Sequence, residues 1–499
     1  MRQVLKMKVR LNIKKMKKVV LLGSMIALIA TSCNTRTGEL VGAQPRPTWY
    51  DIDPFGMLWI PSGSYNMGPS DEDAPYSHTT KSKTVSVQSF YIDQTEISNN
   101  EYRQFVYHVR DSIAHQALFE SGVAEHAIET DANDQPIEPP FVNWDEEILY
   151  GEQDVKEVLE FMYYPAEERF YRRRQLDTRK LNFEYYWLNQ RLAAVKANRF
   201  KPSKTTDEKT GLDFINGGQS TSVGDDKTLG HYDVTDEISD GKGNYSFRER
   251  KDKDRSVFIV KDVINVYPDT LAWIHDFTYS FNEPMTNMYF WHPAYDDYPV
   301  VGVTWKQARA FCIWRTQLFN NWLTGNGEAF VNDFRLPTES EWEYAARGGL
   351  SLSPYPWGGP YILNSNGCYL ANFKPRRGNY LPDGGFHTVR VGSYNPNDYG
   401  LYCMAGNAAE WTSNAFDESS YDFSHDLNPD YVYEAQDNEA NALKRKVIRG
   451  GSWKDAGFYL QNGTRTYEYQ DTAKCYIGFR CVQTYLGRAK GDAFDSGGL

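Results

Sequence analysis

Cysteine is scarce in this chain of 499 residues. Six cysteines occur, no two of them form a Cys-x-x-Cys pair, and no group of cysteine and histidine residues has the spacing of a zinc site. Between Met404 and Lys474 there is no cysteine at all. The sequence therefore excludes a zinc-finger type of site, and it excludes a dithiol site in the stretch between those two residues.

Positive charge is also in short supply. The chain carries 54 Lys and Arg residues against 66 Asp and Glu residues, which gives a net charge of -12. A protein that binds nucleic acid needs a dense basic surface, so this balance indicates no nucleic-acid partner. Hydrophobic residues make up 40% and charged residues 24% of the sequence, as in an ordinary soluble protein with a packed core.

The apolar run near the N-terminus is too short to cross a bilayer. Val19 to Ala30 is an apolar run of twelve residues, whereas a membrane-spanning helix needs about 20. Four lysines between residues 14 and 18 precede the run, and Ala-Thr-Ser-Cys33 closes it. This order predicts a signal peptide over residues 1–32 and lipidation of Cys33 as the mature N-terminus. An ordinary signal peptide with an incidental cysteine is the alternative.

Acyl chains on Cys33 would hold the protein on a membrane, since each buried methylene contributes about 0.8 kcal/mol. No acidic run of the kind that marks surface-exported lipoproteins follows this cysteine. We therefore expect a lipid-anchored protein on the periplasmic face of the outer membrane. Residues 33–53, which contain Pro45 and Pro47, are expected to form the linker to the folded body.

Three capping boxes predict the starts of helices. They are Ser98–Glu101, Thr304–Gln307 and Thr338–Glu341. The first helix is expected to reach about Ile113, and the third to stop near the glycine pair at 348 and 349. Apolar alternation predicts strands within 56–68 and 83–91. Capping and packing also explain the acidic and aromatic residues of the third box, without a catalytic role.

Aromatic residues form 15% of the chain, and many lie in its middle. Residues 146–200 have a helical character, with tyrosines and phenylalanines interleaved with arginines, whereas 201–255 is polar and expected to be a mobile loop. Tyr, Trp and Arg dominate interface hot spots, although these side chains could equally pack within their own subdomain. The candidate partner-binding residues are Tyr163, Tyr164, Phe170, Tyr171, Arg172, Arg173, Arg174, Tyr185, Tyr186 and Trp187.

Four sequence blocks carry a resemblance to a known family. They are Arg335-Leu-Pro-Thr-Glu-Ser-Glu-Trp-Glu-Tyr-Ala-Ala-Arg-Gly-Gly349, the stretch from Pro396 to Trp411, Arg449-Gly-Gly-Ser-Trp453 and Gly478-Phe-Arg-Cys481. In this order they resemble the formylglycine-generating enzyme, or sulfatase-modifying factor, family.

The resemblance implies an α+β fold that is related to C-type lectins and rich in ordered loops, with a large, partly helical insertion. The family domain would be split into residues 54–110 and 292–485. Residues 111–291 would be the insertion, and residues 486–499 would form a C-terminal tail.

The family's oxidation chemistry uses two copper-binding cysteines between the Arg-Gly-Gly-Ser and Gly-Phe-Arg-Cys blocks. Soft thiolates select Cu(I), and oxygen ligands do not replace them. Residues 453–465 of this chain contain no sulfur, so we expect no copper and a scaffold without catalytic residues. An active oxidase that modifies sulfatases is one alternative, and a lectin-like module that binds glycans or peptidoglycan is another.

The resemblance also implies calcium and a disulfide. The expected Ca²⁺ ligands are Asn372, Phe373, Asp383 and Phe386 at one site and Gly406, Ala408 and Glu410 at another. Cys403 stands where the family has an oxygen ligand, and the alternative is that the polar residues only cap turns. Cys312 and Cys481 match bridged positions, and the alternative for them is two buried thiols.

Further blocks resemble one branch of the family, the gliding-motility and type IX secretion lipoproteins of the GldK and PorK type. They include Asp93-Gln-Thr-Glu-Ile-Ser-Asn-Asn-Glu, Leu176-Asp-Thr-Arg-Lys-Leu and Tyr289-Phe-Trp-His-Pro-Ala-Tyr. This likeness implies a non-enzymatic subunit that forms a homo-oligomeric periplasmic ring with a GldN/PorN-type subunit and other type IX secretion components. Peptidoglycan is a further candidate partner.

Overall fold

The computed structural model describes residues 51–69, 81–130, 135–202, 204–206, 213–215, 230–239, 244–252, 254–276 and 284–487. The predicted signal peptide, Cys33, most of the predicted linker and residues 488–499 of the predicted tail lie outside these ranges. Within the described ranges, no helix combines the length and the apolar character that a membrane crossing requires.

Two four-stranded sheets lie among the parts of the chain that carry the recognised sequence blocks. The first has the order β1-β4-β19-β14 and is antiparallel throughout, and the second has the order β17-β16-β15-β18 with one parallel pair, β15 and β18. Their bounds are β1 Met57–Ile60, β4 Phe90–Asp93, β19 Val482–Thr484, β14 Phe334–Arg335, β17 Thr466–Tyr469, β16 Arg445–Arg449, β15 Ala409–Ala415 and β18 Ile477–Gly478. The first sheet therefore joins the two ends of the described chain.

Three helices begin at the predicted capping boxes. They are α2 (Asn99–Glu120), α7 (Trp305–Gly325) and α8 (Glu339–Arg347), and both hydrogen bonds of the capping box are present at each of them. Helix α2 is longer than expected, and the predicted domain boundary at residue 110 falls inside it. It continues because Ala114 and Leu118 keep the spacing of its buried face.

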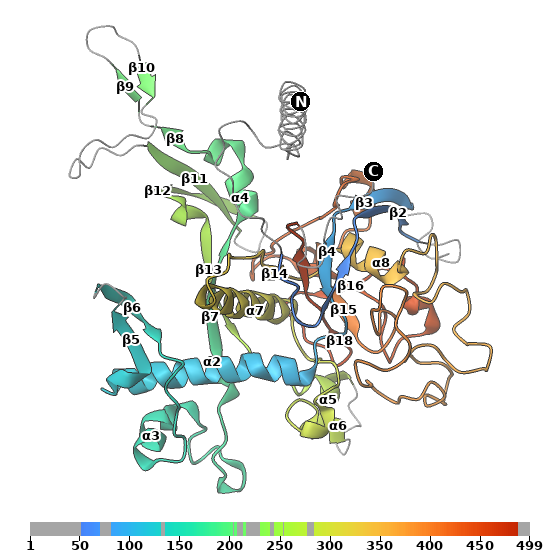
Figure 1. Ribbon diagram of the computed structural model, residues 1–499, viewed down its shortest axis with the longest axis horizontal. Helices are drawn as coiled ribbons and strands as arrows, with labels where there is room; N and C mark the ends of the chain where they lie inside the picture. Colours follow the sequence, from blue (N-terminus) through green and yellow to red (C-terminus); the bar gives the residue numbers. More distant parts are fainter. Residues whose placement is uncertain are drawn as a thin grey trace, which may run out of the picture. The chain divides into compact units, whose positions relative to one another are not determined.

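The main core lies where α2 packs against α7, two helices that lie near one another in Figure 1. Tyr102 of α2 stacks on Phe311 of α7 with 5.6 Å between the ring centroids. Phe105 of α2 meets Trp314 of α7 at 5.2 Å, and Phe479 packs edge-on against Phe311 at 5.4 Å. Many of the chain's aromatic side chains therefore belong to the hydrophobic core.

The expectation of a helical segment over 146–200 is wrong for most of its length. Only two short α-helices occur there, α3 (Gln153–Val158) and α4 (Gln190–Ala194), besides 3-10 turns. The strand β7 (Asn182–Leu188) lies between them and pairs with β13 (Ile259–Asn265). The aromatic run belongs to a strand because alternate side chains, such as Phe183 and Tyr185, pack against the main core.

The expected loop over 201–255 also contains strands. β11 (Gly230–Ser239) and β12 (Tyr245–Asp252) form an antiparallel hairpin. The sequence did not predict this hairpin, because its described side chains include several exposed charged residues and therefore resemble a polar loop in composition. The remaining elements are β2 Gly63–Met67, β3 Lys83–Val87, β5 Ala127–Thr130, β6 Pro136–Val142, β8 Lys201–Pro202, β9 Lys204–Thr206, β10 Asp213–Ile215, α5 Ala272–Asp276, α6 Pro284–Met288 and α9 Ser420–Phe423.

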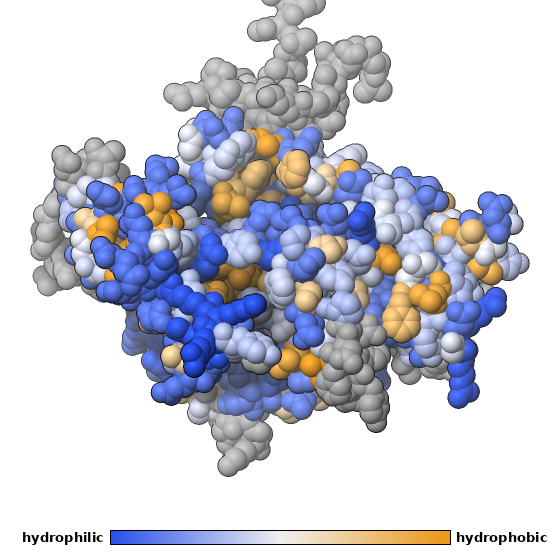
Figure 2. Space-filling view, turned by 90° about the horizontal axis from the view of Figure 1, so that it is seen from below, coloured by the Kyte–Doolittle hydropathy of each residue, from blue (hydrophilic) through white to orange (hydrophobic). Residues whose placement is uncertain are grey.

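The surface of the molecule is mostly hydrophilic, with small separate apolar areas. Figure 2 shows these apolar areas as isolated patches between polar side chains on one face. Scattered apolar residues of this kind are normal for a folded protein.

Candidate functional site

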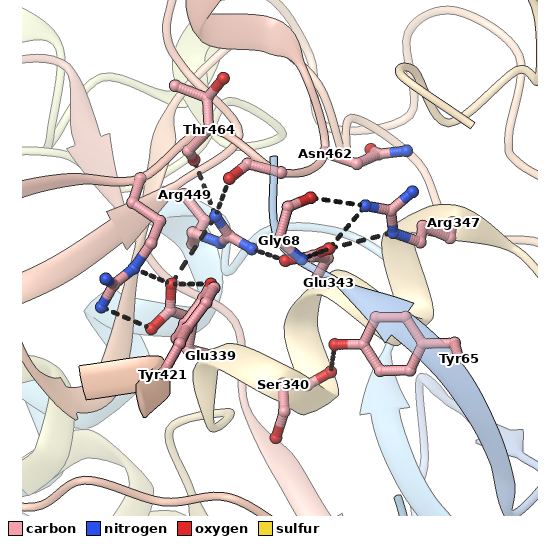
Figure 3. Close-up of polar contacts among 12 residues, drawn as sticks. Tyr65, Gly68, Glu339, Ser340, Glu343, Arg347, Tyr421, Arg449, Asn462 and Thr464 are labelled. Atoms are coloured by element: carbon pink, nitrogen blue, oxygen red, sulfur yellow. Dashed lines mark hydrogen bonds and ion pairs between the residues drawn. The ribbon is translucent and has the colours of Figure 1, made fainter. Parts of the chain in front are cut away.

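A buried ion network surrounds the short helix α8 (Figure 3). One oxygen of Glu343 forms an ion pair with Arg449. Its other oxygen accepts hydrogen bonds from Arg347, at 2.7 and 3.0 Å, and from the Gly68 N–H, at 2.9 Å. Glu343 is fully buried and Arg449 is 1% exposed, so no substrate in solution reaches this carboxylate.

Glu339 extends the same network toward α9. Its carboxylate accepts hydrogen bonds from Arg465 at 2.5 and 3.0 Å and from the Tyr421 hydroxyl at 3.0 Å. Arg449 lies 3.7 Å from it and also donates to two carbonyl groups of the 463–464 turn. Two carboxylates and three guanidinium groups thus fasten α8, α9 and the second sheet together, which is a structural role.

A second buried pair connects the two sheets. Arg480 donates to both oxygens of Glu410, at 2.7 and 2.6 Å, and the Trp342 indole donates to one of them at 2.7 Å. Glu96 lies nearby and accepts from the Ala408 N–H at 2.9 Å. Burial raises the pKa of Glu96 well above its usual range, and the adjacent Glu410 charge raises it further. The family's sequence blocks therefore meet in the core.

These two ionic clusters were not predicted as a group. Each block was recognisable by its order along the chain, but the sequence does not indicate which acidic residue pairs with which arginine. The structure places the Arg335–Gly349 block against Arg449 and Arg480, which come from the third and fourth blocks.

Residues 453–465, where the resemblance implies the family's copper-binding cysteines, are held in the fold by packing and ion pairs. Trp453 stacks on Trp273 at 5.9 Å, and its indole donates to the Cys475 carbonyl at 3.3 Å. Leu460 is fully buried, and Arg465 belongs to the ion network. In the described part of the chain, no group of three or more His, Cys, Asp or Glu residues is placed to hold a metal ion.

The buried cysteines Cys475, Cys312 and Cys481 lie at two separate places. Cys475 lies 3.2 Å from an oxygen of Asp276, and burial raises the pKa of its thiol. Cys312 and Cys481 face each other in the core with 3.3 Å between their sulfur atoms, and both are free thiols here. The two residues predicted to be bridged are thus neighbours, and the covalent bond stays a prediction.

The first candidate calcium site has an unsatisfied oxygen. The side-chain oxygen of Asn372 is buried and has no hydrogen-bond partner among the described residues. Asp383 accepts from the Phe373 N–H at 2.7 Å and the Gly385 N–H at 3.3 Å, and burial raises the pKa of its carboxyl. A buried amide oxygen beside a carboxylate is a donor set that fits Ca²⁺. Phe386 is exposed and would contribute only its carbonyl group.

The second candidate calcium site is different. Both oxygens of Glu410 are occupied by Arg480 and Trp342, so a guanidinium group already neutralises the carboxylate. Burial raises the pKa of the nearby Cys403 thiol well above its usual range, and a protonated thiol is a poor ligand for a hard cation. These residues do not fit Ca²⁺ as well as the first set does.

Calcium binding is testable by thermal unfolding. A ligand that binds only the folded state raises stability by RT ln(1 + [L]/Kd), so millimolar Ca²⁺ should raise the unfolding temperature relative to EGTA. Asp383→Asn should remove most of this increase, while Asp333→Asn, at an exposed carboxylate outside the site, should keep it. Identical unfolding curves of the wild type in Ca²⁺ and EGTA would contradict calcium binding.

The ten candidate partner-binding residues separate into two places. Those at 163–174 lie in a region of short 3-10 turns, where Arg174 stacks over Tyr163 at 3.7 Å. Tyr171, Arg172 and Arg173 are exposed there. The other three residues lie on β7, where Tyr186 is exposed and Trp187 is half-buried.

Tyr185 does not fit the interface prediction. It is only 2% exposed and belongs to the main core. The alternation of β7 turns it toward the core, whereas Tyr186 next to it points outward. The side chain of Phe170 lies outside the described part of the structure.

A groove of about 910 Å³ is lined by residues of β7 and α7, among others. Its floor includes Trp305 and Arg309 of α7, and Arg309 lies 4.1 Å from the ring centre of Trp187 and 2.8 Å from a Glu434 oxygen. The sequence did not predict this groove, because it is formed by residues far apart in the chain, from β7, α7, the segment 332–341 that contains β14 and the start of α8, and the loop at 428–434.

The sulfatase-modifying factor enzyme 1-like domain family matches residues 48–199 and 275–485. The chain belongs to this family. The two matched stretches are separated by residues 200–274, a narrower interval than the predicted insertion of 111–291.

Individual relatives include an inactive protein and an active enzyme. The inactive C-alpha-formylglycine-generating enzyme 2 of Bos taurus is 35% identical over 203 residues, which are 39% of this chain and 53% of that protein. The formylglycine-generating enzyme of Streptomyces coelicolor is 33% identical over 192 residues, or 37% of this chain and 52% of the enzyme. The chain thus spans about half the length of these relatives.

Among solved structures, PvdO from Pseudomonas aeruginosa aligns with a TM-score of 0.40 at 15% identity, covering 89% of this chain and all of that one. CarF aligns with a TM-score of 0.28 at 25% identity, covering 39% of this chain and 70% of that one.

Proposed function

We propose that this chain is a non-catalytic, lipid-anchored structural subunit of the type IX secretion and gliding-motility machinery. In this proposal, Cys33 carries the lipid, the body faces the periplasm beneath the outer membrane, and copies of the chain form a ring with a GldN/PorN-type subunit. The sequence blocks of the GldK and PorK type support this branch of the family.

One observation carries the non-catalytic part of the proposal. The stretch that would supply a copper-binding thiol pair has no sulfur, and its side chains are committed to packing. Trp453, Leu460 and Arg465 each have a defined structural partner there. The inactive relative from Bos taurus supports the idea that members of this family can persist without the oxidation chemistry.

The full chain, purified in detergent from native outer membranes, tests both parts. We expect ring-shaped particles that contain a second subunit in electron micrographs. The same preparation should bind no stoichiometric Cu(I) and convert no cysteine of a sulfatase-derived peptide to formylglycine. An active formylglycine-generating enzyme, assayed in parallel, is the positive control.

The activity assay and the electron micrographs test different parts of the proposal, so each can contradict its own part alone. Copper-dependent turnover above a heat-inactivated sample would show that the chain is an enzyme. Monomeric particles without a second subunit, or wild-type protein without acyl mass on Cys33, would contradict the assembly and anchoring parts.

A further inference from the structure

Among the described residues, β7 and β13 form a two-stranded sheet, so no further strand pairs with the outer edge of either one. Outside the strands themselves, the Asn189 N–H donates to the Phe258 carbonyl at 2.9 Å and the Val266 N–H donates to the Leu181 carbonyl at 3.0 Å. Both pairs continue the register in which Leu188 lies opposite Ile259. Hydrogen-bonded pairs therefore involve the odd-numbered residues of β7, because bonded and non-bonded pairs alternate in an antiparallel ladder.

The backbone groups of the even-numbered residues point away from β13. In the described part of the chain, no hydrogen bond reaches the N–H or C=O groups of Glu184, Tyr186 or Leu188. On the opposite edge of the sheet, Gln307 already donates to the Asn265 carbonyl at 3.0 Å. An unpaired edge of this kind is a template for an additional strand.

The unpaired edge of β7 borders the groove. The groove is lined by Tyr186, Trp187 and Leu188 of β7. No described residue of β13 lines the groove. The groove is therefore on the side of β7 that faces away from its partner strand. A segment lying in the groove could reach both the free backbone groups and the floor formed by α7.

The charges in the groove indicate what such a segment would carry. Of the four carboxylates that line it, Glu341 and Glu434 form ion pairs with Arg335 and Arg309, at 2.6 and 2.8 Å. The other two are Asp333 and Asp430. The groove is also lined by Arg191, which lies 5.6 Å from the ring centre of Tyr433 and forms no ion pair with a carboxylate of the described residues.

Asp333 and Asp430 are solvent accessible, and no basic side chain of the described residues lies within ion-pair distance of either. Burial is the main cause that raises the pKa of Asp430 to about 6, while the charges of Arg335 and Lys446 act to lower it. Burial also raises the pKa of Asp333. A cation placed beside them would offset this cost.

We propose that the groove beside β7 is the docking site for an extended, basic segment of a partner chain. The segment adds a third strand to the free edge at Glu184, Tyr186 and Leu188, and its lysine or arginine side chains lie against Asp333 and Asp430. This inference rests on the proposed role as an assembly subunit, and it names the surface and the chemistry of the contact.

A short fluorescent peptide in which lysine alternates with valine is the probe, used with the full chain in fluorescence anisotropy. Wild-type protein should bind it at least about tenfold more tightly than the same peptide with glutamate in place of lysine, as expected when like charges replace opposite ones. Asp333→Asn combined with Asp430→Asn should weaken binding about tenfold. Glu328→Gln, at an exposed carboxylate outside the groove, is the charge control and should leave binding unchanged.

Proline variants test the strand addition. Tyr186→Pro removes an N–H from the outer edge of β7, beside the groove, and should reduce peptide binding about tenfold or more. Val263→Pro removes an equivalent outward N–H from the other edge of the same sheet, and it should leave binding unchanged. The unfolding temperatures of the two proline variants show whether either variant has lost its fold. If their stabilities differ, binding is compared between proline substitutions of equal stability, one on the outer edge of each strand.

Three results would overturn the proposal. They are equal binding of the lysine and glutamate peptides, equal loss of binding in the two proline variants, and binding of peptidoglycan fragments instead of the peptide in a way that depends on Asp333 and Asp430. If the chain forms native rings but the peptide does not bind, this inference fails and the proposed function stands. If the peptide binds but no ring or second subunit is found, the proposed function fails and the docking groove stands.

Discussion

Replacing Glu343 with glutamine should destabilise the protein by about 3–5 kcal/mol, the usual cost of breaking a buried ion pair from one side. Glu343 holds two arginines, Arg449 and Arg347, in a place that water does not reach. Glutamine keeps the size of the side chain but leaves both guanidinium groups without their shared anion. Because folded proteins are stable by only about 5–15 kcal/mol, the loss should be obvious in a urea unfolding curve.

The control for Glu343→Gln is the same change at Glu328, an exposed residue with no ion pair among the described residues. Surface changes of this kind usually alter stability by no more than about 0.5 kcal/mol. If both variants unfold at the same urea concentration as the wild type, the network does not stabilise the fold as the structure indicates.

Replacing Gly406 with alanine should destabilise the protein by about 3 kcal/mol or more. Gly406 has a φ of +80°, and a Cβ at this position would lie 2.2 Å from the Asn372 carbonyl oxygen. The positive φ of a non-glycine residue and an overpacked contact each cost about 1–3 kcal/mol. The contact is with backbone that also accepts the Asn407 N–H at 2.8 Å, so it has little freedom to move away.

Gly367→Ala separates the two contributions. Gly367 has nearly the same φ, +78°, but no described atom beyond its chain neighbours lies within 4 Å of the point that a Cβ would occupy. Only the backbone cost of about 1–2 kcal/mol should remain there. Equal losses in the two alanine variants, measured by urea unfolding, would show that the close approach at Gly406 has no energetic effect.

The helix starts were predictable from the sequence because capping is local. A capping box involves residues three positions apart, and Ser98, Thr304 and Thr338 each form the expected bonds. The absence of thiols between Met404 and Lys474 is equally a property of the sequence alone. The strands predicted in 56–68 were also correct, as β1 and β2.

The nature of residues 182–188 was not predictable in this way. Their aromatic and charged residues suggested a helix, but β7 exists because β13, about 75 residues further on, pairs with it. That pairing turns Tyr185 into the core and leaves Tyr186 at the groove. A local pattern does not include a partner strand so distant in the sequence.

The sequence by itself therefore determined the family, the helix starts and the absence of cysteine between Met404 and Lys474. Only the tertiary structure decided which charges pair around Glu343 and Glu410, how Cys312 and Cys481 face each other, and where a groove forms beside β7. The physical reason is that ion pairs, sulfur contacts and grooves depend on distances between segments far apart in the chain. Capping depends only on residues close together in the sequence, and composition does not depend on their order at all.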